Sequence, residues 1–280
     1  MASMDDWKGD LGRTWGDYTE IMDRMLSPFG DAALENLGDI AGKGVLDLGC
    51  GGGESTVKLA RAVGDKGVVI GVDVSADLIF LANQQRKAAG ASNMALMCAD
   101  ASELALGEPV DALYSRFGAM FFDKPIDAYA RIHSQMKPGA KASIICWRGF
   151  KENLWAFAPF VAAADYLPKV PPLPPGAPGP FAWAKPEESA IPYLTKSGWK
   201  NIRTRPVDHE IVMGAGIEGD PVEAALHFAM KIGPLSARME GMKAAQKKKI
   251  HDAVRAALEK HLMNGAVRVK GACWLITATA

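Results

Sequence analysis

The chain has 280 residues, 49% of them hydrophobic and 23% charged, which is typical of an ordinary soluble globular protein with a sizeable core. Lysine and arginine together number 32, as do aspartate and glutamate, so no overall charge would draw the chain to nucleic acid or to an anionic membrane. This balance counts against an RNA or DNA substrate.

The cysteines and the N-terminal residues narrow the class further. Four cysteines lie far apart and show neither C-x-x-C spacing nor a Cys/His ligand pattern, so we expect reduced thiols and no metal site. Residues 1–10 contain no apolar run, and no stretch approaches membrane-spanning length. We therefore expect a cytoplasmic protein without a membrane partner.

The first expected element is a helix that precedes the first strand. Trp15, Tyr18 and Met22 have the spacing i, i+3 and i+7, which places them on one face of a helix. That face could cover a ligand, or it could simply pack on the core. We assign residues 1–40 to an N-terminal helical cap.

Short apolar runs then alternate with helical patterns from Val45 to Trp147. This rhythm predicts a doubly wound α/β domain over residues 41–150, in which ligands bind at the carboxyl ends of the strands. The expected strands are 44–48, 68–72, 94–98, 110–115 and 142–147, with helices over 55–63, 75–89 and 125–136 between them.

A proline-rich segment follows the fifth strand. Nine of the chain's 17 prolines lie between Pro168 and Pro192, together with Phe181 and Trp183. Because proline fixes φ and removes a backbone donor, we expect an irregular loop here. It is either a lid over a substrate or a stiff connector on the solvent side.

The rest of the chain supplies two more strands and two helices. We expect strand six over 198–213, strand seven over 267–277, and helices around 222–229 and 250–262. The predicted fold is therefore α/β, with a doubly wound, seven-stranded, mostly parallel Rossmann-like sheet and helices on both faces. Residues 151–280 would contribute the lid or substrate region and complete the sheet.

A glycine-rich turn joins the first strand to the following helix. It has the pattern Asp-x-Gly-x-Gly-x-Gly from Asp47 to Gly53, whereas the dinucleotide pattern G-x-G-x-x-G counted from Gly49 would need a glycine at Glu54. Glycine permits φ > 0 and a close approach of ligand to backbone. Asp73 and Asp100 follow at the ends of the next two strands, so three carboxylates should meet at one edge of the sheet.

This pattern resembles the first motif of class I S-adenosylmethionine (SAM)-dependent methyltransferases, over roughly residues 44–147. The resemblance implies SAM as cofactor and S-adenosylhomocysteine as product. It places Asp47 at the methionine end of SAM, Asp73 on the ribose hydroxyls, and Asp100 with the backbone of Ala101 on the adenine. Asp100 could instead be a turn former or helix cap, since Ser102 follows. The expected cofactor-binding residues are Asp47, Gly49, Cys50, Gly51, Asp73, Val74, Asp100, Ala101, Ser115, Trp15 and Tyr18.

The acceptor should lie on the far side of the methyl group. We expect it to contact Arg116, Phe117, Met120, Trp147 and Trp183, although packing is the simpler role for any one of them. A base becomes necessary only for an acceptor of high pKa. Of the five histidines we favour His227, on the helix expected to overhang the pocket.

Absent motifs narrow the acceptor class. Methyltransferases that act on adenine, cytosine or glutamine amide often carry Asn/Asp-Pro-Pro-Tyr/Phe after strand four, where this chain has Ser-Arg-Phe-Gly at 115–118. We expect a small, partly apolar acceptor methylated at oxygen, with carbon or nitrogen as the alternatives, and a monomer or homodimer. A SAM-binding sensor or accessory protein, or a nucleotide-binding module not specific for SAM, remains a rival interpretation.

Overall fold

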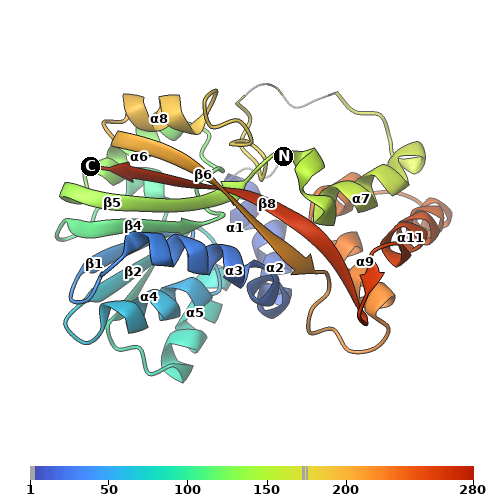
Figure 1. Cartoon of the computed structure of the whole chain (residues 1–280), viewed down its shortest axis with the longest axis horizontal. Helices are drawn as coiled ribbons and strands as arrows, with labels where there is room; N and C mark the ends of the chain where they lie inside the picture. Colours follow the sequence, from blue (N-terminus) through green and yellow to red (C-terminus); the bar gives the residue numbers. More distant parts are fainter. Residues whose placement is uncertain (1–3, 172–173, 175) are drawn as a thin grey trace.

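The sheet is mixed rather than mostly parallel. The computed structural model describes residues 4–171, 174 and 176–280. Its eight strands run in the order β3-β2-β1-β4-β5-β8-β6, with β7 paired to β8 (Figure 1). The strands are β1 (Gly44–Leu48), β2 (Val68–Asp73), β3 (Met94–Cys98), β4 (Val110–Arg116), β5 (Met136–Trp147), β6 (Lys200–Val212), β7 (Leu262–Met263) and β8 (Ala266–Thr279).

Strands β1 to β5 pair in parallel, whereas β8 pairs antiparallel with both β5 and β6. The Rossmann-like α/β fold is thus confirmed, and the expectation of seven mostly parallel strands is corrected. The eighth strand, β7, was not expected, because Leu262 fitted the apolar spacing of the preceding helix. Instead the backbone turns at Asn264 (φ 50°) and Gly265 (φ 72°), which are the paired left-handed residues of a tight hairpin.

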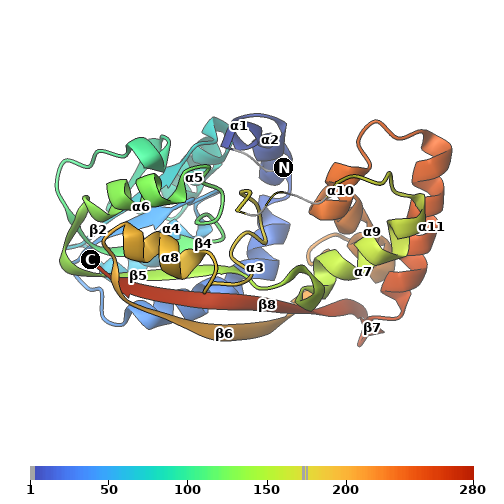
Figure 2. The same ribbon diagram turned by 90° about the horizontal axis from the view of Figure 1, so that it is seen from above.

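Helices cover both faces of the sheet. Helix α3 packs over β4, β5 and β6, and α4 over β1, β2 and β3, while α6 and α8 lie together on the other face (Figures 1 and 2). The helices are α1 (Met4–Lys8), α2 (Asp10–Asp17), α3 (Thr19–Leu37), α4 (Glu54–Val63), α5 (Ala76–Ala88), α6 (Pro125–His133), α7 (Leu154–Ala163), α8 (Ala190–Lys196), α9 (Pro221–Lys231), α10 (Pro234–Arg238) and α11 (Ala244–Glu259). Within the described ranges, no helix is long and apolar enough to cross a membrane.

A second lobe is built on the extension of two strands. Strand β5 ends where Trp147 pairs with Cys273, but β6 continues to the pair Val212–Arg268. The two-stranded ribbon of β6 and β8 therefore leaves the main sheet and carries α7, α9, α10 and α11 (Figure 2). Helix α7 was not expected. It is apolar on nearly all sides and packs among β8, α9, α10 and α11, so its sequence shows no amphipathic period.

The strand order reverses between β1 and β4. Crossovers from β1 proceed to β2 and β3 on one side, and those from β4 to β5 proceed on the other, so the carboxyl ends of β1 and β4 frame a crevice. Leu46 and Leu113 pair across this point and are fully buried. The crevice is where an open α/β sheet binds its ligand.

Candidate active site

A cavity of about 1400 Å³ opens at this crevice and extends to the second lobe. Its core end is formed by the glycine turn and by the ends of β2 and β3. Its roof comes from α1, α2 and α3, and its far end from α7 and α10. The expected cofactor residues on its wall are Gly49, Cys50, Gly51, Asp73, Val74, Ala101 and Trp15.

The glycine turn has a backbone that only small residues permit. Gly49 (φ +69°) lies so near Gly118 that a Cβ built on it would be 2.7 Å from the Cα of Gly118. Gly51 (φ +54°) faces open space, and a Cβ there would meet no atom within 4 Å. A side chain at either position would therefore strain the turn or project into the ligand's space.

Asp73, at the end of β2, binds the backbone of the glycine turn through its side chain. Its Oδ2 accepts from the backbone N–H of Gly51 at 2.9 Å, and its Oδ1 accepts from that of Ser75 at 3.0 Å. A carboxylate has about four acceptor sites, so two remain for hydroxyl donors of a ligand. Burial raises the pKa of Asp73, and the backbone donors oppose that shift.

Asp47 lies beneath the cavity wall rather than on it, contrary to expectation. It is fully buried, and its Oδ2 accepts from Ser55 Oγ at 2.8 Å and Thr56 Oγ1 at 2.7 Å. These bonds fasten the start of α4 to β1. Its Oδ1 is buried with no partner among the described residues, and burial raises the pKa of Asp47 to about 6.

Asp100 and Ser115 are not among the residues that line the cavity, and both have local partners. Asp100 Oδ1 accepts from the N–H of Ser102 at 2.8 Å and caps the short 3₁₀ turn Ala101–Glu103, which is the alternative role that its sequence context left open. Ser115 is fully buried and donates to the carbonyl of Leu48 at 2.8 Å, so it joins β4 to β1. Both side chains were expected to contact the cofactor, and neither lines the cavity.

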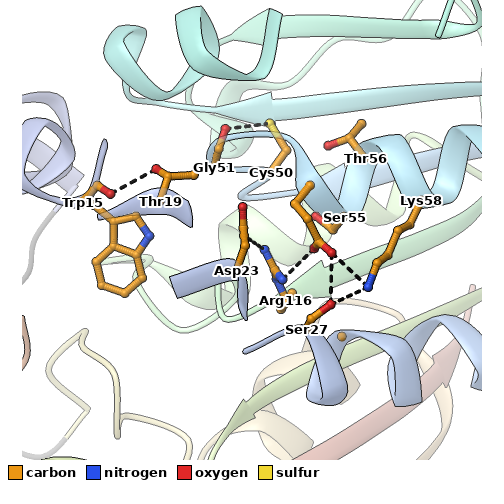
Figure 3. Close-up of polar contacts among 12 residues, drawn as sticks. Trp15, Thr19, Asp23, Ser27, Cys50, Gly51, Ser55, Thr56, Lys58 and Arg116 are labelled. Atoms are coloured by element: carbon orange, nitrogen blue, oxygen red, sulfur yellow. Dashed lines mark hydrogen bonds and ion pairs between the residues drawn. The ribbon is translucent and has the colours of Figure 1, made fainter. Parts of the chain in front are cut away.

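A buried ion-pair network holds the roof to the core. Arg116 Nη2 contacts Asp23 Oδ1 at 2.7 Å, and its Nη1 contacts Glu54 Oε2 at 2.8 Å (Figure 3). Glu54 also pairs with Lys58 at 2.9 Å. The network joins α3, α4 and the end of β4. Burial raises the pKa of Asp23, and the Arg116 guanidinium opposes this shift.

Aromatic side chains of the N-terminal helices close the cavity from above. Trp7 and Trp15 both line it, with ring centroids 5.2 Å apart, and Trp7 makes a second edge contact with Phe121 at 5.2 Å. Tyr18 points elsewhere: its hydroxyl lies 2.7 Å from Nε2 of His227. Tyr18 is therefore not part of the cavity wall.

His227 does not reach the cavity, contrary to the expected role as a base. It is exposed on α9 and engaged by Tyr18. The described residues that line the cavity include no histidine. The carboxylates among them are Asp6, Asp10, Asp23, Asp73 and Glu240.

Three of the expected acceptor residues line the cavity, and two of them are stacked aromatic rings. Phe117, Met120 and Trp147 line the cavity, and the rings of Phe117 and Trp147 stack with centroids 4.3 Å apart. Phe117 has φ +61°, a strained conformation for a bulky residue and one often found at functional sites. Arg116 also lines the cavity, but its guanidinium is already paired with Asp23 and Glu54. Trp183 is buried against Tyr129, with ring centroids 5.5 Å apart, and lies outside the wall.

The far end of the cavity is aromatic. Trp155 lies beside Trp147, with centroids 5.1 Å apart, and Phe150 makes edge contacts with Phe160 and Phe181. The proline-rich segment contributes its described residues 170, 171, 174 and 176–182, whereas 172, 173 and 175 lie outside the described residues. The irregular part of this segment ends at residue 189, and α8 begins at Ala190.

Several wall residues were missed by the reading of the sequence. They lie on α1, α2, α3, α7 and α10, outside the strand–turn–helix unit of the glycine turn, and no motif marks them. The missed residues are Trp7, Thr14, Thr19, Asp23, Phe160 and Arg238.

Comparison with known proteins identifies the domain that contains the glycine turn. Residues 45–139 match the family model described as a methyltransferase domain. Aklanonic acid methyltransferase DauC of Streptomyces sp. (strain C5) is 25% identical over 155 residues, which are 55% of this chain and 68% of the relative. The 2-phytyl-1,4-naphtoquinone methyltransferase of Nostoc punctiforme is 34% identical over 107 residues, which are 38% of this chain and 46% of the relative.

A solved structure agrees at the level of the fold. Phosphoethanolamine N-methyltransferase 2 of Haemonchus contortus, in complex with SAM, superposes with a TM-score of 0.57 at 16% identity, over 100% of this chain and 60% of that one. The switch-point cavity with its glycine turn and Asp73 defines an α/β protein that binds a nucleoside cofactor. Residues 45–139 therefore form a methyltransferase domain, and the resemblance to class I SAM-dependent methyltransferases seen in the sequence is confirmed.

The residues at the core end fit SAM. Gly51 leaves the space that a Cβ would fill, Asp73 retains acceptor capacity for two ribose hydroxyls, and Val74 and Ala101 give apolar walls for a base. Bound there, SAM would supply a methyl group bonded to its positively charged sulfonium sulfur. Its positive charge suits the Asp73 carboxylate at this end.

Proposed function

We propose that this chain transfers the methyl group of SAM to an oxygen atom of a small, partly apolar organic acceptor. The observation that carries the proposal is the continuity of the cavity. One space joins the glycine turn and Asp73 to a wall of Trp147, Phe150 and Trp155. A cofactor at one end and an apolar acceptor at the other would therefore share one enclosure.

The transfer is an in-line displacement, in which a bond forms between acceptor oxygen and methyl carbon as the carbon–sulfur bond breaks. The sulfonium becomes the thioether of S-adenosylhomocysteine. The chain contributes by holding both partners in line and excluding water, and such alignment alone can be worth an effective molarity of about 10⁵ to 10⁸ M. The stacked rings of Phe117 and Trp147 would help to fix the acceptor's plane.

The proton of the acceptor bears on which atom is methylated. The cavity wall, as described, offers no histidine, and three of its five carboxylates are engaged: Asp23 with Arg116, Asp10 with Arg13, and Asp73 with the backbone of the glycine turn. This favours an acceptor acidic enough to lose its proton without a dedicated base, such as a phenol, an enol or a carboxylic acid. Of the relatives reported above, one is named for a carboxylic acid, aklanonic acid, and one for a substituted naphthoquinone.

Three alternatives follow from the same cavity. An enol acceptor could be methylated at carbon instead of oxygen, and a small neutral amine could be methylated at nitrogen. A chain that binds SAM but has no acceptor would be a sensor or an accessory protein. The aromatic far end argues for an acceptor, since a cofactor-only protein has no need of it.

The test is a titration followed by an activity screen. S-adenosylhomocysteine, SAM and NAD are titrated calorimetrically, and the chain is then incubated with methyl-labelled SAM and a panel of phenols, enols, carboxylic acids and amines. We expect SAM and S-adenosylhomocysteine to bind, NAD not to bind, and label to pass to an acidic hydroxyl or carboxyl compound. Binding of NAD instead of SAM, or transfer only to amines, would contradict the proposal.

A further inference from the structure

The far end of the cavity carries an arginine that has no carboxylate partner among the described residues. Arg238 ends α10 and lines the cavity, and its Nη2 donates to the backbone carbonyl of Pro168. The guanidinium carbon lies 5.7 Å from the centroid of the Phe160 ring. Its Nε is buried without a hydrogen-bond partner in the part of the chain that the structure describes. The side chain is thus held in place by neutral groups, and its charge is not neutralised.

Arg238 contrasts with the other arginine of the wall. Arg116 is paired with both Asp23 and Glu54, so its charge is balanced by the protein itself. Arg238 forms no ion pair with any described residue. A half-buried guanidinium that the fold positions but does not neutralise is suited to a ligand's anionic group.

Charge is unevenly distributed along the cavity. The wall residues of the second lobe include three cations, Lys231, Arg238 and Lys247, and one carboxylate, Glu240. The other carboxylates of the wall, among them Asp73 and Asp23, belong to the cofactor end and its roof. A cationic cofactor therefore faces acidic groups, and the opposite end presents net positive charge to the acceptor.

We propose that the acceptor is an aromatic carboxylate, whose carboxylate is bound by Arg238 and whose ring lies against Phe160, Phe150 and Phe181. The inference rests on the proposed function, because it assigns the substrate class of that same cavity. A planar guanidinium matches a carboxylate with two parallel hydrogen bonds, and the edge-to-face rings around it match a flat aromatic body. Arg238 would anchor the carboxylate and so position the acceptor.

The proposal can be tested with a pair of probes of the same shape, one with a negatively charged carboxylate and one with a neutral amide in its place. 2-Naphthoate and its neutral amide, 2-naphthamide, are titrated into the full chain saturated with S-adenosylhomocysteine. We expect the carboxylate to bind about tenfold or more tightly than the amide, as is typical when a hydrogen bond to a charged group is at stake. In Arg238→Gln this preference should disappear while naphthamide affinity stays the same, and Arg238→Lys should restore part of it.

A matched control removes a charge elsewhere in the same lobe. Arg255 is an exposed residue of α11 that pairs with Glu223 and Glu259 and does not line the cavity. Arg255→Gln should keep the full preference for naphthoate. Retained naphthamide and S-adenosylhomocysteine affinity in the Arg238 variants shows that they are folded.

The outcomes separate this inference from the proposed function. If the wild-type chain binds both probes equally, binds neither, or keeps its preference in Arg238→Gln, the carboxylate assignment is overturned. S-adenosylhomocysteine affinity, measured on the same samples, decides whether the cofactor assignment stands. A chain that binds S-adenosylhomocysteine and methylates neutral phenols, but shows no preference for naphthoate, would retain the proposed function and lose this inference.

Discussion

Arg116 reaches Asp23 across the roof of the cavity, with Nη2 2.7 Å from Oδ1, and the two side chains are only 11% and 15% exposed. Asp23→Asn leaves the guanidinium with Glu54 alone. Because a buried charge loses one of its partners, we expect the free energy of unfolding to fall by about 1 to 3 kcal/mol. Urea denaturation followed by circular dichroism measures it.

The control for that variant lies on the same helix. Glu20 pairs with Arg24 at i, i+4, but the two side chains are 80% and 52% exposed. Glu20→Gln should cost less than about 0.5 kcal/mol, since exposed pairs of this kind contribute little. Equal denaturation midpoints for the two variants would show that the Arg116 network does not secure the roof.

Asp73→Ala tests the cofactor site directly. The substitution removes the acceptor proposed for the ribose hydroxyls and the bond that orders Gly51. We expect the affinity for S-adenosylhomocysteine to fall by about 1.5 to 3 kcal/mol, roughly 10- to 150-fold, which calorimetry can measure. Asp77→Asn, in the first turn of α5, provides the control and should bind as the wild type does. Unchanged affinity in Asp73→Ala would contradict the assignment.

The cofactor half of the site was predictable because its signals are local. Glycines at fixed spacing after an apolar strand, and a carboxylate at the end of the next strand, depend only on neighbours within one β-α-β unit. The direction of the Asp47 side chain, by contrast, could not be predicted from such local signals. Strand β1 is buried on both faces, so Leu46, Asp47 and Leu48 show no alternation that would reveal which way the carboxylate points.

The second lobe was less predictable because its elements are shaped by distant contacts. Helix α7 lacks an amphipathic pattern since its surroundings are apolar on several sides, and His227 was placed over the pocket without knowledge that Tyr18 would engage it. Arg238 has no motif at all. By contrast, Asn264-Gly265 between apolar runs is a strong hairpin signal that could have corrected the end of the preceding helix.

Gly118→Ala should disrupt the close contact between the glycine turn at Gly49 and the turn that follows β4 at Gly118. A Cβ at this position would lie 2.6 Å from the carbonyl oxygen of Leu48 and 2.8 Å from the Cα of Gly49, so backbone must move. We expect a loss of about 1 to 3 kcal/mol in unfolding free energy and weaker S-adenosylhomocysteine binding. Gly107→Ala is the matched control, because a Cβ there meets nothing within 4 Å. Similar thermal midpoints for both variants would argue against the close crossing.

Asp47 should make the stability of the ligand-free protein depend on pH. Burial raises its pKa from 3.8 to about 6, so the folded state favours the protonated carboxyl. The stabilisation is fully present below about pH 4 and is lost as the pH rises through 6. Relative to Asp47→Asn, the wild-type free energy of unfolding should therefore fall by about 2 kcal/mol between pH 4 and pH 7. Parallel stability curves for the two proteins would mean that Asp47 titrates normally.

The contact between Tyr18 and His227 predicts a structural role for this histidine. Their side chains lie 2.7 Å apart and join α9 to the helical roof outside the cavity wall. A general base typically contributes about 100-fold or more to turnover, so His227→Asn should lower turnover by much less than that. In a double-mutant cycle with Tyr18→Phe, urea denaturation should give a coupling energy of about 0.5 to 1 kcal/mol, as expected for one half-exposed hydrogen bond. A 100-fold loss of turnover with wild-type stability would instead restore His227 as the base and require the roof to move during the reaction.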